Sequence, residues 1–172
     1  MKILHVTLVF TLFSSQAITK ESNLIKKTKY ELTPETKGVL LIDGIPASGA
    51  DIELVVGAMG ETFTHISTTD NSGKFYFPEI SKDKLLGPGV FDEQLVSVSI
   101  DTEYKGKSVK IWRTVTAGYD FKPFMLDNMA NLTCEIKSNL KYFIFSKDSN
   151  GSDDYEVHSI CNLIGSTESG EY

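Results

Sequence analysis

The repeated alternation of apolar and polar residues in short runs is the feature that most constrains how this chain can fold. Residues 51–56, 96–101 and 132–136 each carry an apolar side chain at every second position. Successive side chains of a β-strand point to opposite faces, so this period predicts strands with one buried face. Turn-forming residues such as Asp43-Gly44 separate the runs. The pattern predicts an all-β chain.

Continued along the chain, the pattern predicts one antiparallel β-sandwich of about seven to nine strands with one short helix. We expect this single domain to span residues 37–164. Residues 18–36 are polar and predict an N-terminal arm or a weak first strand. Residues 165–172 predict a flexible polar tail.

The one helical segment is expected at residues 81–86. A serine at its start can cap it, Gly87 can end it in a left-handed conformation, and Pro88 prevents its continuation. Residues 121–126 are apolar but are interrupted by Pro123, which favours an irregular segment at a sheet edge. Further on, both faces of a strand at 140–145 are apolar, which predicts a strand covered on both sides.

The N-terminus has the three-part pattern of a secretory signal peptide over residues 1–17. Lys2 precedes an apolar stretch, and small residues end at Ala17. The alternative is a buried N-terminal strand. No later stretch is long and apolar enough to cross a bilayer, so we expect a periplasmic or secreted protein with no stable membrane insertion after cleavage.

The sequence contains two cysteines, Cys134 and Cys161, and both follow the expected signal peptide. In an exported protein an even number of cysteines indicates pairing. A disulfide across a loop of this length stabilises a fold by about 3–4 kcal/mol. A zinc site is the weaker alternative, because only His65 and His158 could complete it.

The net charge of −6 is unevenly distributed. No lysine or arginine follows Lys147, whereas Asp153, Asp154 and Glu156 form the densest acidic cluster. An acidic surface argues against nucleic acid as a partner. The cluster is either a solvated end that keeps the protein soluble or a negatively charged surface that attracts a basic protein partner.

Residues 38–50 and 68–77 resemble the opening of transthyretin-like, carboxypeptidase-regulatory-like domains. The shared features are a strand, a turn with Pro and Gly-Ala, a second strand, and then Thr-Asp-x-x-Gly-x-Phe-x-Phe. In that motif Asp70 and Gly73 build a turn, and two phenylalanines enter the core. The resemblance implies a prealbumin-like sandwich of two antiparallel sheets. Relatives of this shape are often small exported bacterial proteins of unassigned function.

Trp112 is the candidate anchor of a binding surface. It falls on the polar face of the strand at 109–115, opposite Val109, Ile111 and Val115. Tyr104 and Tyr119, near the turns on either side of this strand, enlarge the expected patch. The alternative is that the later C-terminal strands cover Trp112.

No catalytic set emerges from the sequence. There is no Gly-x-Ser-x-Gly turn and no phosphate-binding glycine loop, and both cysteines are assigned to the disulfide. We therefore expect neither an enzyme nor a bound cofactor or metal. Asn131 and Asn150 begin N-glycosylation sequences, which matter only in a eukaryotic secretory pathway.

These features together predict an exported, non-catalytic binding protein that acts by protein–protein interaction in the cell envelope. An inhibitor or immunity protein against an envelope toxin is a concrete form of this hypothesis. The alternative is a sandwich module that binds a small ligand or a carbohydrate.

Overall fold

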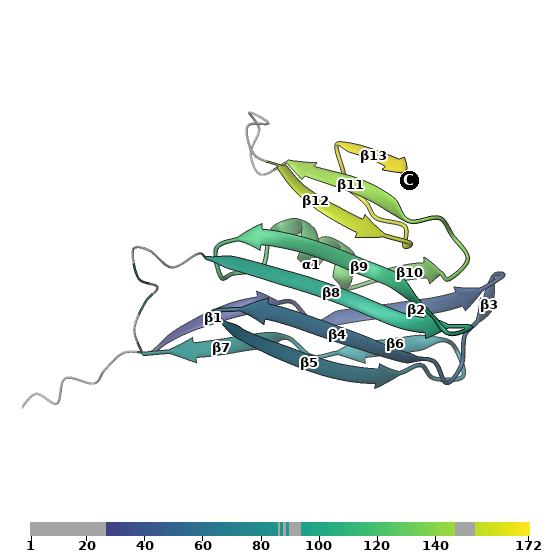
Figure 1. Ribbon diagram of the computed structural model, residues 1–172, viewed down its shortest axis with the longest axis horizontal. Coiled ribbons are helices and arrows are strands. Elements are labelled where there is room, and N and C mark those ends of the chain that lie inside the picture. Colours follow the sequence, from purple (N-terminus) through teal and green to yellow (C-terminus); the bar gives the residue numbers. More distant parts are fainter. Residues whose placement is uncertain (1–26, 86, 88, 90–93, 147–153) are drawn as a thin grey trace, which may run out of the picture.

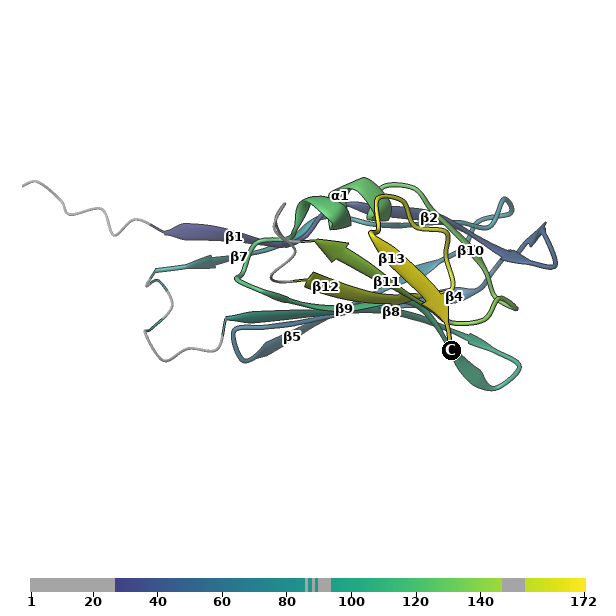
Figure 2. The same cartoon turned by 90° about the horizontal axis from the view of Figure 1, so that it is seen from above.

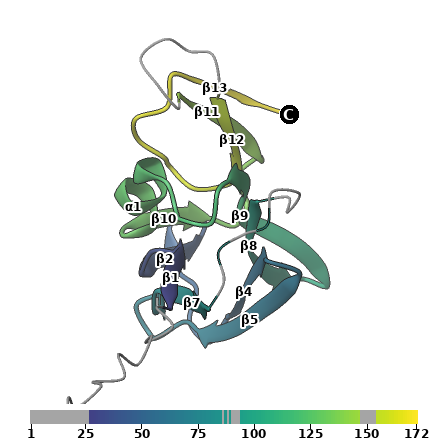
Figure 3. The same ribbon diagram turned by 90° about the vertical axis from the view of Figure 1, so that its left-hand side faces the viewer.

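Two layers of β-structure make up the chain in the computed structural model, which describes residues 27–85, 87, 89, 94–146 and 154–172 (Figure 1). Seen from above, β1, β2 and the helix α1 lie along one side, and β5, β8 and β9 lie along the other (Figure 2). The end view shows the same two layers (Figure 3). The predicted all-β sandwich is confirmed.

The larger layer is a seven-stranded antiparallel sheet with the strand order β13-β11-β12-β9-β8-β4-β5. Its strands are β4 (Asp51–Ala58), β5 (Glu61–Thr68), β8 (Leu95–Tyr104), β9 (Lys107–Ala117), β11 (Lys141–Ser146), β12 (Asp154–Ser159) and β13 (Glu168–Glu171). The alternation read from the sequence holds in β4 and β8, whose apolar residues at every second position are buried. One face of this sheet therefore forms half of the core.

The second layer consists of two smaller sheets and α1. Its elements are β1 (Thr28–Thr33), β2 (Thr36–Ile42), β3 (Ile45–Pro46), β6 (Lys74–Phe77), β7 (Ile80–Lys84), α1 (Pro123–Met129) and β10 (Leu132–Glu135). β1 pairs with β7, and β2 pairs with β3, β6 and β10. Only the β2–β10 pair is parallel among the described strands. Leu40, Phe75 and Phe77 are buried on the inner face of this layer.

The turn between β5 and β6 matches the prediction from its motif. Asp70 Oδ1 accepts hydrogen bonds from the backbone N–H groups of Ser72 (2.8 Å) and Lys74 (2.9 Å). Both hydrogen bonds lower the pKa of Asp70, and the one from the Lys74 N–H has the larger effect. Gly73 has a φ of 72°, and a Cβ there would lie 2.5 Å from the carbonyl oxygen of Leu40, so glycine is required for two reasons.

The helix predicted at residues 81–86 is wrong. Residues 80–84 form β7, which pairs with β1 inside the segment expected to be an arm or weak first strand. An isolated turn of helix is marginal in water, whereas pairing with β1 buries Ile80 in the core. Long-range pairing therefore overrides the local capping signals.

The helix of this fold lies instead where an irregular edge segment was expected. Pro123 occupies the first turn of α1, a position where its missing N–H removes no hydrogen bond. Met125 and Met129, four residues apart, are both fully buried. Among the described residues, no helix is long and apolar enough to cross a membrane.

A β-bulge in β9 reverses the expected orientation of Trp112. Ile100 pairs with Trp112 and Asp101 pairs with Lys110, which leaves Ile111 as the extra residue. Beyond the bulge the inner and outer faces exchange, so Trp112 is 0% exposed and Val115 is 48% exposed. The expectation that Trp112 is a surface anchor is therefore wrong. The alternative had the later C-terminal strands as its cover, whereas the ring stacked on the buried indole is Phe124 of α1.

The C-terminal residues expected to form a flexible tail include an edge strand. β13 pairs with β11 in a regular antiparallel register. The Thr167 N–H also donates to the Ile144 carbonyl oxygen at 2.8 Å. Because this pairing is with a strand more than twenty residues away, composition alone did not reveal it. The predicted signal peptide lies outside the described residues.

The predicted disulfide between Cys134 and Cys161 is present, and both residues are fully buried. Cys134 lies in β10, in the smaller layer, and Cys161 follows β12, in the larger one. The Asn162 N–H donates to the Thr133 carbonyl oxygen at 3.1 Å beside it. The disulfide therefore ties the two layers together.

Glu135 joins β10 to the β2–β3 turn and should make stability depend on pH. Its carboxylate accepts backbone N–H bonds from Gly44 (2.9 Å), Asp43 (3.1 Å) and Lys137 (3.2 Å), which lower its pKa. A lowered carboxyl pKa adds stability above the ordinary glutamate value near 4.3, and that stability is lost as the pH falls through the folded-state pKa.

We therefore expect Glu135→Gln to lower the urea midpoint at pH 7, with the difference from wild type shrinking in acid. Urea unfolding followed by circular dichroism between pH 7 and acid measures this. Glu103→Gln, an exposed change in β8, is the charge-matched control. A deficit of Glu135→Gln that stays constant with pH would contradict the role of the ionised carboxylate.

Candidate functional site

An open groove on the outer face of β11, β12 and β13 is the candidate binding site. Its volume is about 450 Å³, and it is lined by Tyr142, Ile144, Asp154, Glu156, Glu168 and Tyr172. Alternation in the strands explains this set. In β11, Phe143 and Phe145 point into the core, so Tyr142 and Ile144 point outward.

The register of the three strands brings these side chains side by side. Ile144 pairs with Glu156 on one neighbour and with Glu168 on the other. Tyr142 pairs with His158 of β12 and with Gly170 of β13. A Cβ at Gly170 would lie 2.6 Å from the Tyr142 ring, so a glycine there leaves room for that ring.

Three aromatic rings form one wall of the site. The Tyr172 ring stacks on the His158 ring with centroids 5.4 Å apart and an interplanar angle of 8°. The Tyr142 ring meets Tyr172 edge-on at 5.9 Å. Tyr172 is nevertheless 70% exposed. The wall thus offers a large aromatic surface to solvent.

Carboxylates hold the tyrosine hydroxyls. Tyr142 Oη donates to Glu168 Oε1 at 3.0 Å, and Tyr172 Oη donates to Glu156 Oε1 at 3.1 Å. The hydrogen bond to Glu168 raises the pKa of Tyr142. Partial desolvation of the hydroxyl, followed by the hydrogen bond to Glu156, raises the pKa of Tyr172. Both tyrosines therefore remain protonated donors at neutral pH.

His158 lies between a carboxylate and a tyrosine hydroxyl. Its Nε2 is 3.1 Å from Glu156 Oε1, and its Nδ1 is 3.1 Å from Tyr172 Oη. Both ring nitrogens are thus engaged. His65, the other histidine considered for a metal site, is exposed in β5, and the described residues contain no group of three metal-ligating side chains.

Buried Asn128 of α1 positions the chain that leads into β13. Its Nδ2 donates to the carbonyl oxygens of Phe124 (2.8 Å) and Ile164 (3.1 Å), and its Oδ1 accepts the Ile164 N–H at 2.7 Å. A buried amide with three such bonds is a strong local constraint. The helix therefore helps to place Glu168 and Tyr172.

The residues predicted for binding from the sequence do not form one site. Asp154 and Glu156 lie in the groove, while Asp153 lies outside the described residues. Tyr119 is 5% exposed and packs edge-on against Tyr30 at 5.4 Å. Tyr104 is half-buried next to Lys105 at the β8–β9 turn. The expected patch of Trp112, Tyr104 and Tyr119 is therefore absent.

Sequence reasoning missed Tyr142, Glu168 and Tyr172. The sequence predicts a strand covered on both faces around Tyr142, but the outer face of β11 is only half-buried. Glu168 and Tyr172 fall in the segment whose composition predicts a flexible polar tail. The alternation in residues 141–146 was the available signal for an outward-facing tyrosine.

A family model described as a domain of unknown function (DUF6795) matches residues 36–139, which is more than half of the chain. The chain belongs to this family. No curated protein and no solved structure matched it. The DUF6795 match extends from β2 through β10 and ends before β11. The groove therefore lies on strands that follow the DUF6795 match.

The two N-glycosylation sequences differ in their placement. Asn131 is exposed immediately before β10, within the DUF6795 match. Asn150 lies outside the described residues. An acceptor at Asn131 is thus sterically reachable.

Proposed function

We propose that this protein is an exported, non-catalytic binding protein whose C-terminal groove holds a basic segment of another protein. The observation that carries the proposal is the meeting of two tyrosines and three carboxylates, Asp154, Glu156 and Glu168, in one groove. Among the described residues that line it there is no lysine or arginine. This chemistry suits an ammonium or guanidinium group.

An aromatic ring and a carboxylate attract the same cation in different ways. A lysine or arginine placed over an exposed tyrosine ring gains about 0.5–2 kcal/mol from the cation–π interaction. A carboxylate adds a charge-assisted hydrogen bond. Tyr172 and Glu156, joined by their own hydrogen bond, are placed to do both to one side chain.

The net charge favours the same class of partner. At −6 the protein attracts basic surfaces and repels acidic ones, which raises the association rate with a basic protein. The disulfide supports an oxidising compartment outside the cytoplasm. An inhibitor or immunity protein acting against a basic toxin in the envelope is the specific form of this proposal.

Affinity capture with a matched pair of variants tests the proposal. The groove variant is Asp154→Asn/Glu156→Gln/Glu168→Gln, and the control is Asp83→Asn/Glu53→Gln/Glu103→Gln, three exposed acids outside the groove. The two variants change charge equally. Tagged proteins are incubated with envelope extract of the host, and retained proteins are quantified by mass spectrometry.

We expect wild type and control to retain the same basic protein and the groove variant to retain at least tenfold less. Tyr172→Ala, which removes the ring but no charge, should weaken binding of the purified partner about tenfold, or about 1.4 kcal/mol. Equal retention by the groove variant and the control would show that the groove is not the binding site.

A further inference from the structure

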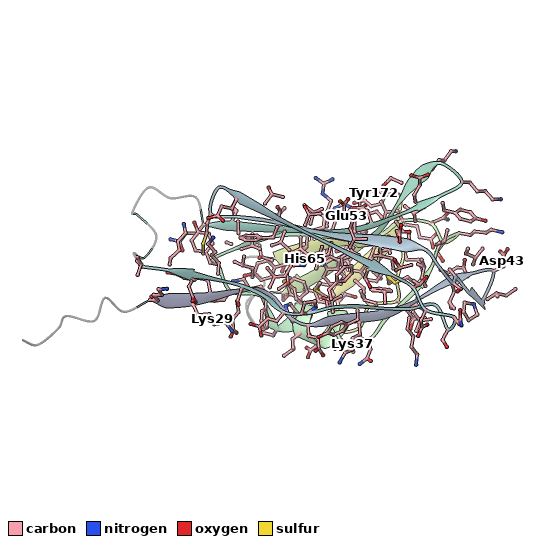
Figure 4. All side chains as sticks on the ribbon, turned by 90° about the horizontal axis from the view of Figure 1, so that it is seen from below. Lys29, Lys37, Asp43, Glu53, His65 and Tyr172 are labelled. Atoms are coloured by element: carbon pink, nitrogen blue, oxygen red, sulfur yellow. A yellow bond between two sulfur atoms is a disulfide. The ribbon has the colours of Figure 1, made fainter. Side chains whose placement is uncertain are left out.

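The outer edge of β5 is an open edge of the larger sheet. β5 is the last strand in the order of that sheet, and among the described strands it pairs only with β4. The pairing is regular over all eight residues of β5, without a bulge. Figure 1 shows β5 along the lower border of the sheet, and Figure 4 looks onto this border, with His65 near the middle of the view. One whole side of a long strand is therefore without a strand partner in the described structure.

Every second residue of β5 directs its backbone N–H and C=O groups to the open edge. Residues along an antiparallel pair alternate between those that bond to the neighbouring strand and those that point away from it. The Thr69 N–H donates to the Ala50 carbonyl oxygen at 2.9 Å, which continues the β4–β5 ladder and fixes its phase. Residues 63, 65 and 67 therefore bond to β4. The residues that point to the open edge are Thr62, Thr64, Ile66 and Thr68.

β5 lacks the features by which proteins protect an open strand edge from other strands. Such features include a lysine or proline on the strand, a β-bulge and a very short strand. Residues 61–68 contain no lysine, arginine, proline or glycine, and four of them are β-branched. By contrast, β13 at the other end of the same sheet has four residues, two of which are glutamates. The contrast indicates that the open edge of β5 serves to pair with another strand.

The β5 edge carries no unpaired charge, although the net charge of the protein is −6. Glu61 is the one acidic residue of β5, and its carboxylate forms an ion pair with Lys82 of β7 at 2.7 Å. The Lys82 ammonium also lies 5.7 Å from the centroid of the Phe63 ring. Two copies of an acidic chain repel each other least where no unpaired charge is exposed. This favours a second copy of the chain over a charged peptide as the partner of β5.

We infer that β5 pairs with β5 of a second copy, antiparallel about a two-fold axis, so that the two larger sheets become one continuous sheet. Such a contact requires a self-complementary surface. With the two copies of His65 opposite each other, Thr64 pairs with the partner's Ile66, and Thr62 pairs with the partner's Thr68. All edge-directed residues then form hydrogen-bonded pairs, and no like charges lie opposite each other.

A groove adjoins the end of β5 that would receive the partner's β4–β5 turn. Its volume is about 540 Å³, and its lining includes Ser67, Thr68 and Asp70. In the antiparallel register, residues 59–60 of the partner extend beyond Thr68. The groove leaves space for this turn beside the strand.

Sedimentation velocity over a concentration series tests the pairing on the purified chain with its disulfide formed. We expect a reversible equilibrium between monomer and dimer. Ile66→Lys should weaken the dimer at least tenfold, because it places a charge in each of the two symmetry-related Thr64–Ile66 pairs. Val115→Lys makes the same change of charge at a side chain 48% exposed on β9, three strands away, and should leave the equilibrium unchanged.

Hydrogen exchange locates the contact at single residues. In the dimer the amide protons of Thr62, Thr64 and Ile66 become hydrogen-bonded, so their exchange should slow at least tenfold from the monomeric to the dimeric concentration range. Residues 63, 65 and 67 bond to β4 in both states, so exchange of their amide protons should change much less.

A cysteine at position 65 tests the register. Residues opposite each other in a non-hydrogen-bonded pair have Cα atoms about 4.5 Å apart, which lies within the range that a disulfide spans. Oxidised His65→Cys should therefore form a covalent dimer on a non-reducing gel. Thr62→Cys, which lies opposite Thr68 of the partner, should form at least tenfold less.

Three results would overturn the inference: a monomer at every concentration, a dimer that Ile66→Lys leaves as stable as wild type, or equal cross-linking of His65→Cys and Thr62→Cys. The inference is independent of the proposed function. The groove variant Asp154→Asn/Glu156→Gln/Glu168→Gln should still dimerise, and Ile66→Lys should still retain the basic partner. Circular dichroism checks that each variant folds, which we expect because the replaced side chains are exposed.

Discussion

Replacing Trp112 by alanine is expected to lower the free energy of unfolding by about 3–5 kcal/mol, as large core truncations do. The indole is fully buried and stacks on Phe124 of α1 with centroids 6.4 Å apart. Phe124 in turn stacks on Phe145 of β11 at 4.6 Å. The truncation would thus open a cavity where α1 meets the larger sheet. A domain of this size has about 5–15 kcal/mol in all, so the loss is a large share.

Urea unfolding monitored by far-ultraviolet circular dichroism measures this effect. Tryptophan fluorescence cannot be used, because Trp112 is the one tryptophan of the chain. The indole nitrogen has no hydrogen-bond partner among the described residues. Trp112→Phe therefore loses only packing, and we expect it to be destabilised by about 1–2 kcal/mol. A Trp112→Ala protein with wild-type stability but without the binding of a partner would instead indicate that Trp112 is a surface anchor.

Replacing both cysteines by alanine is expected to destabilise the fold by about 3–4 kcal/mol, the value for a loop of this length. Cys134 and Cys161 are 27 residues apart and connect the two layers. Without the bond, the unfolded chain regains the conformational freedom that the closed loop removes. The strands that carry the candidate site should then detach most readily from the rest of the sandwich.

Urea unfolding in the presence and absence of a reductant separates this effect from simple loss of packing. Wild type unfolded under reducing conditions should approach the stability of the double variant, which itself should not respond to the reductant. Hydrogen exchange of β12 and β13 should rise more than that of β4 and β8. An equal rise in hydrogen exchange in all four strands would contradict a local role of the disulfide.

Parts of the fold with a local physical cause were predictable from the sequence. The alternation in β4 and β8 matches their buried faces, and the motif around Asp70 and Gly73 forms the expected turn. The cysteine pair formed the expected bond. The resemblance to transthyretin-like domains is a prediction about family membership and stays a prediction.

Errors arose where a distant partner decides the local structure. Residues 80–84 carry helix-capping signals, yet they form a strand that pairs with β1. Residues 168–171 are polar, yet they form an edge strand that pairs with β11. In both cases backbone hydrogen bonds to a strand far away in the chain outweigh weak local preferences.

The candidate site shows the same division. The acidity of Asp154 and Glu156 was visible in the sequence, whereas their neighbours Tyr142 and Tyr172 became neighbours only through strand pairing. The sequence also could not show that residues of β2, β5, β6 and β10 line one groove of about 540 Å³.

By itself, then, the sequence determined the strand-rich class, the turns and the disulfide, because residue period and turn chemistry act over a few positions and two cysteines allow only one pairing within the chain. Only the tertiary structure decided which face Trp112 occupies, since one extra residue at Ile111 inverts a strand whose faces alternate at every position. It alone also decided which side chains share a groove, because strand register is set by pairing between distant segments.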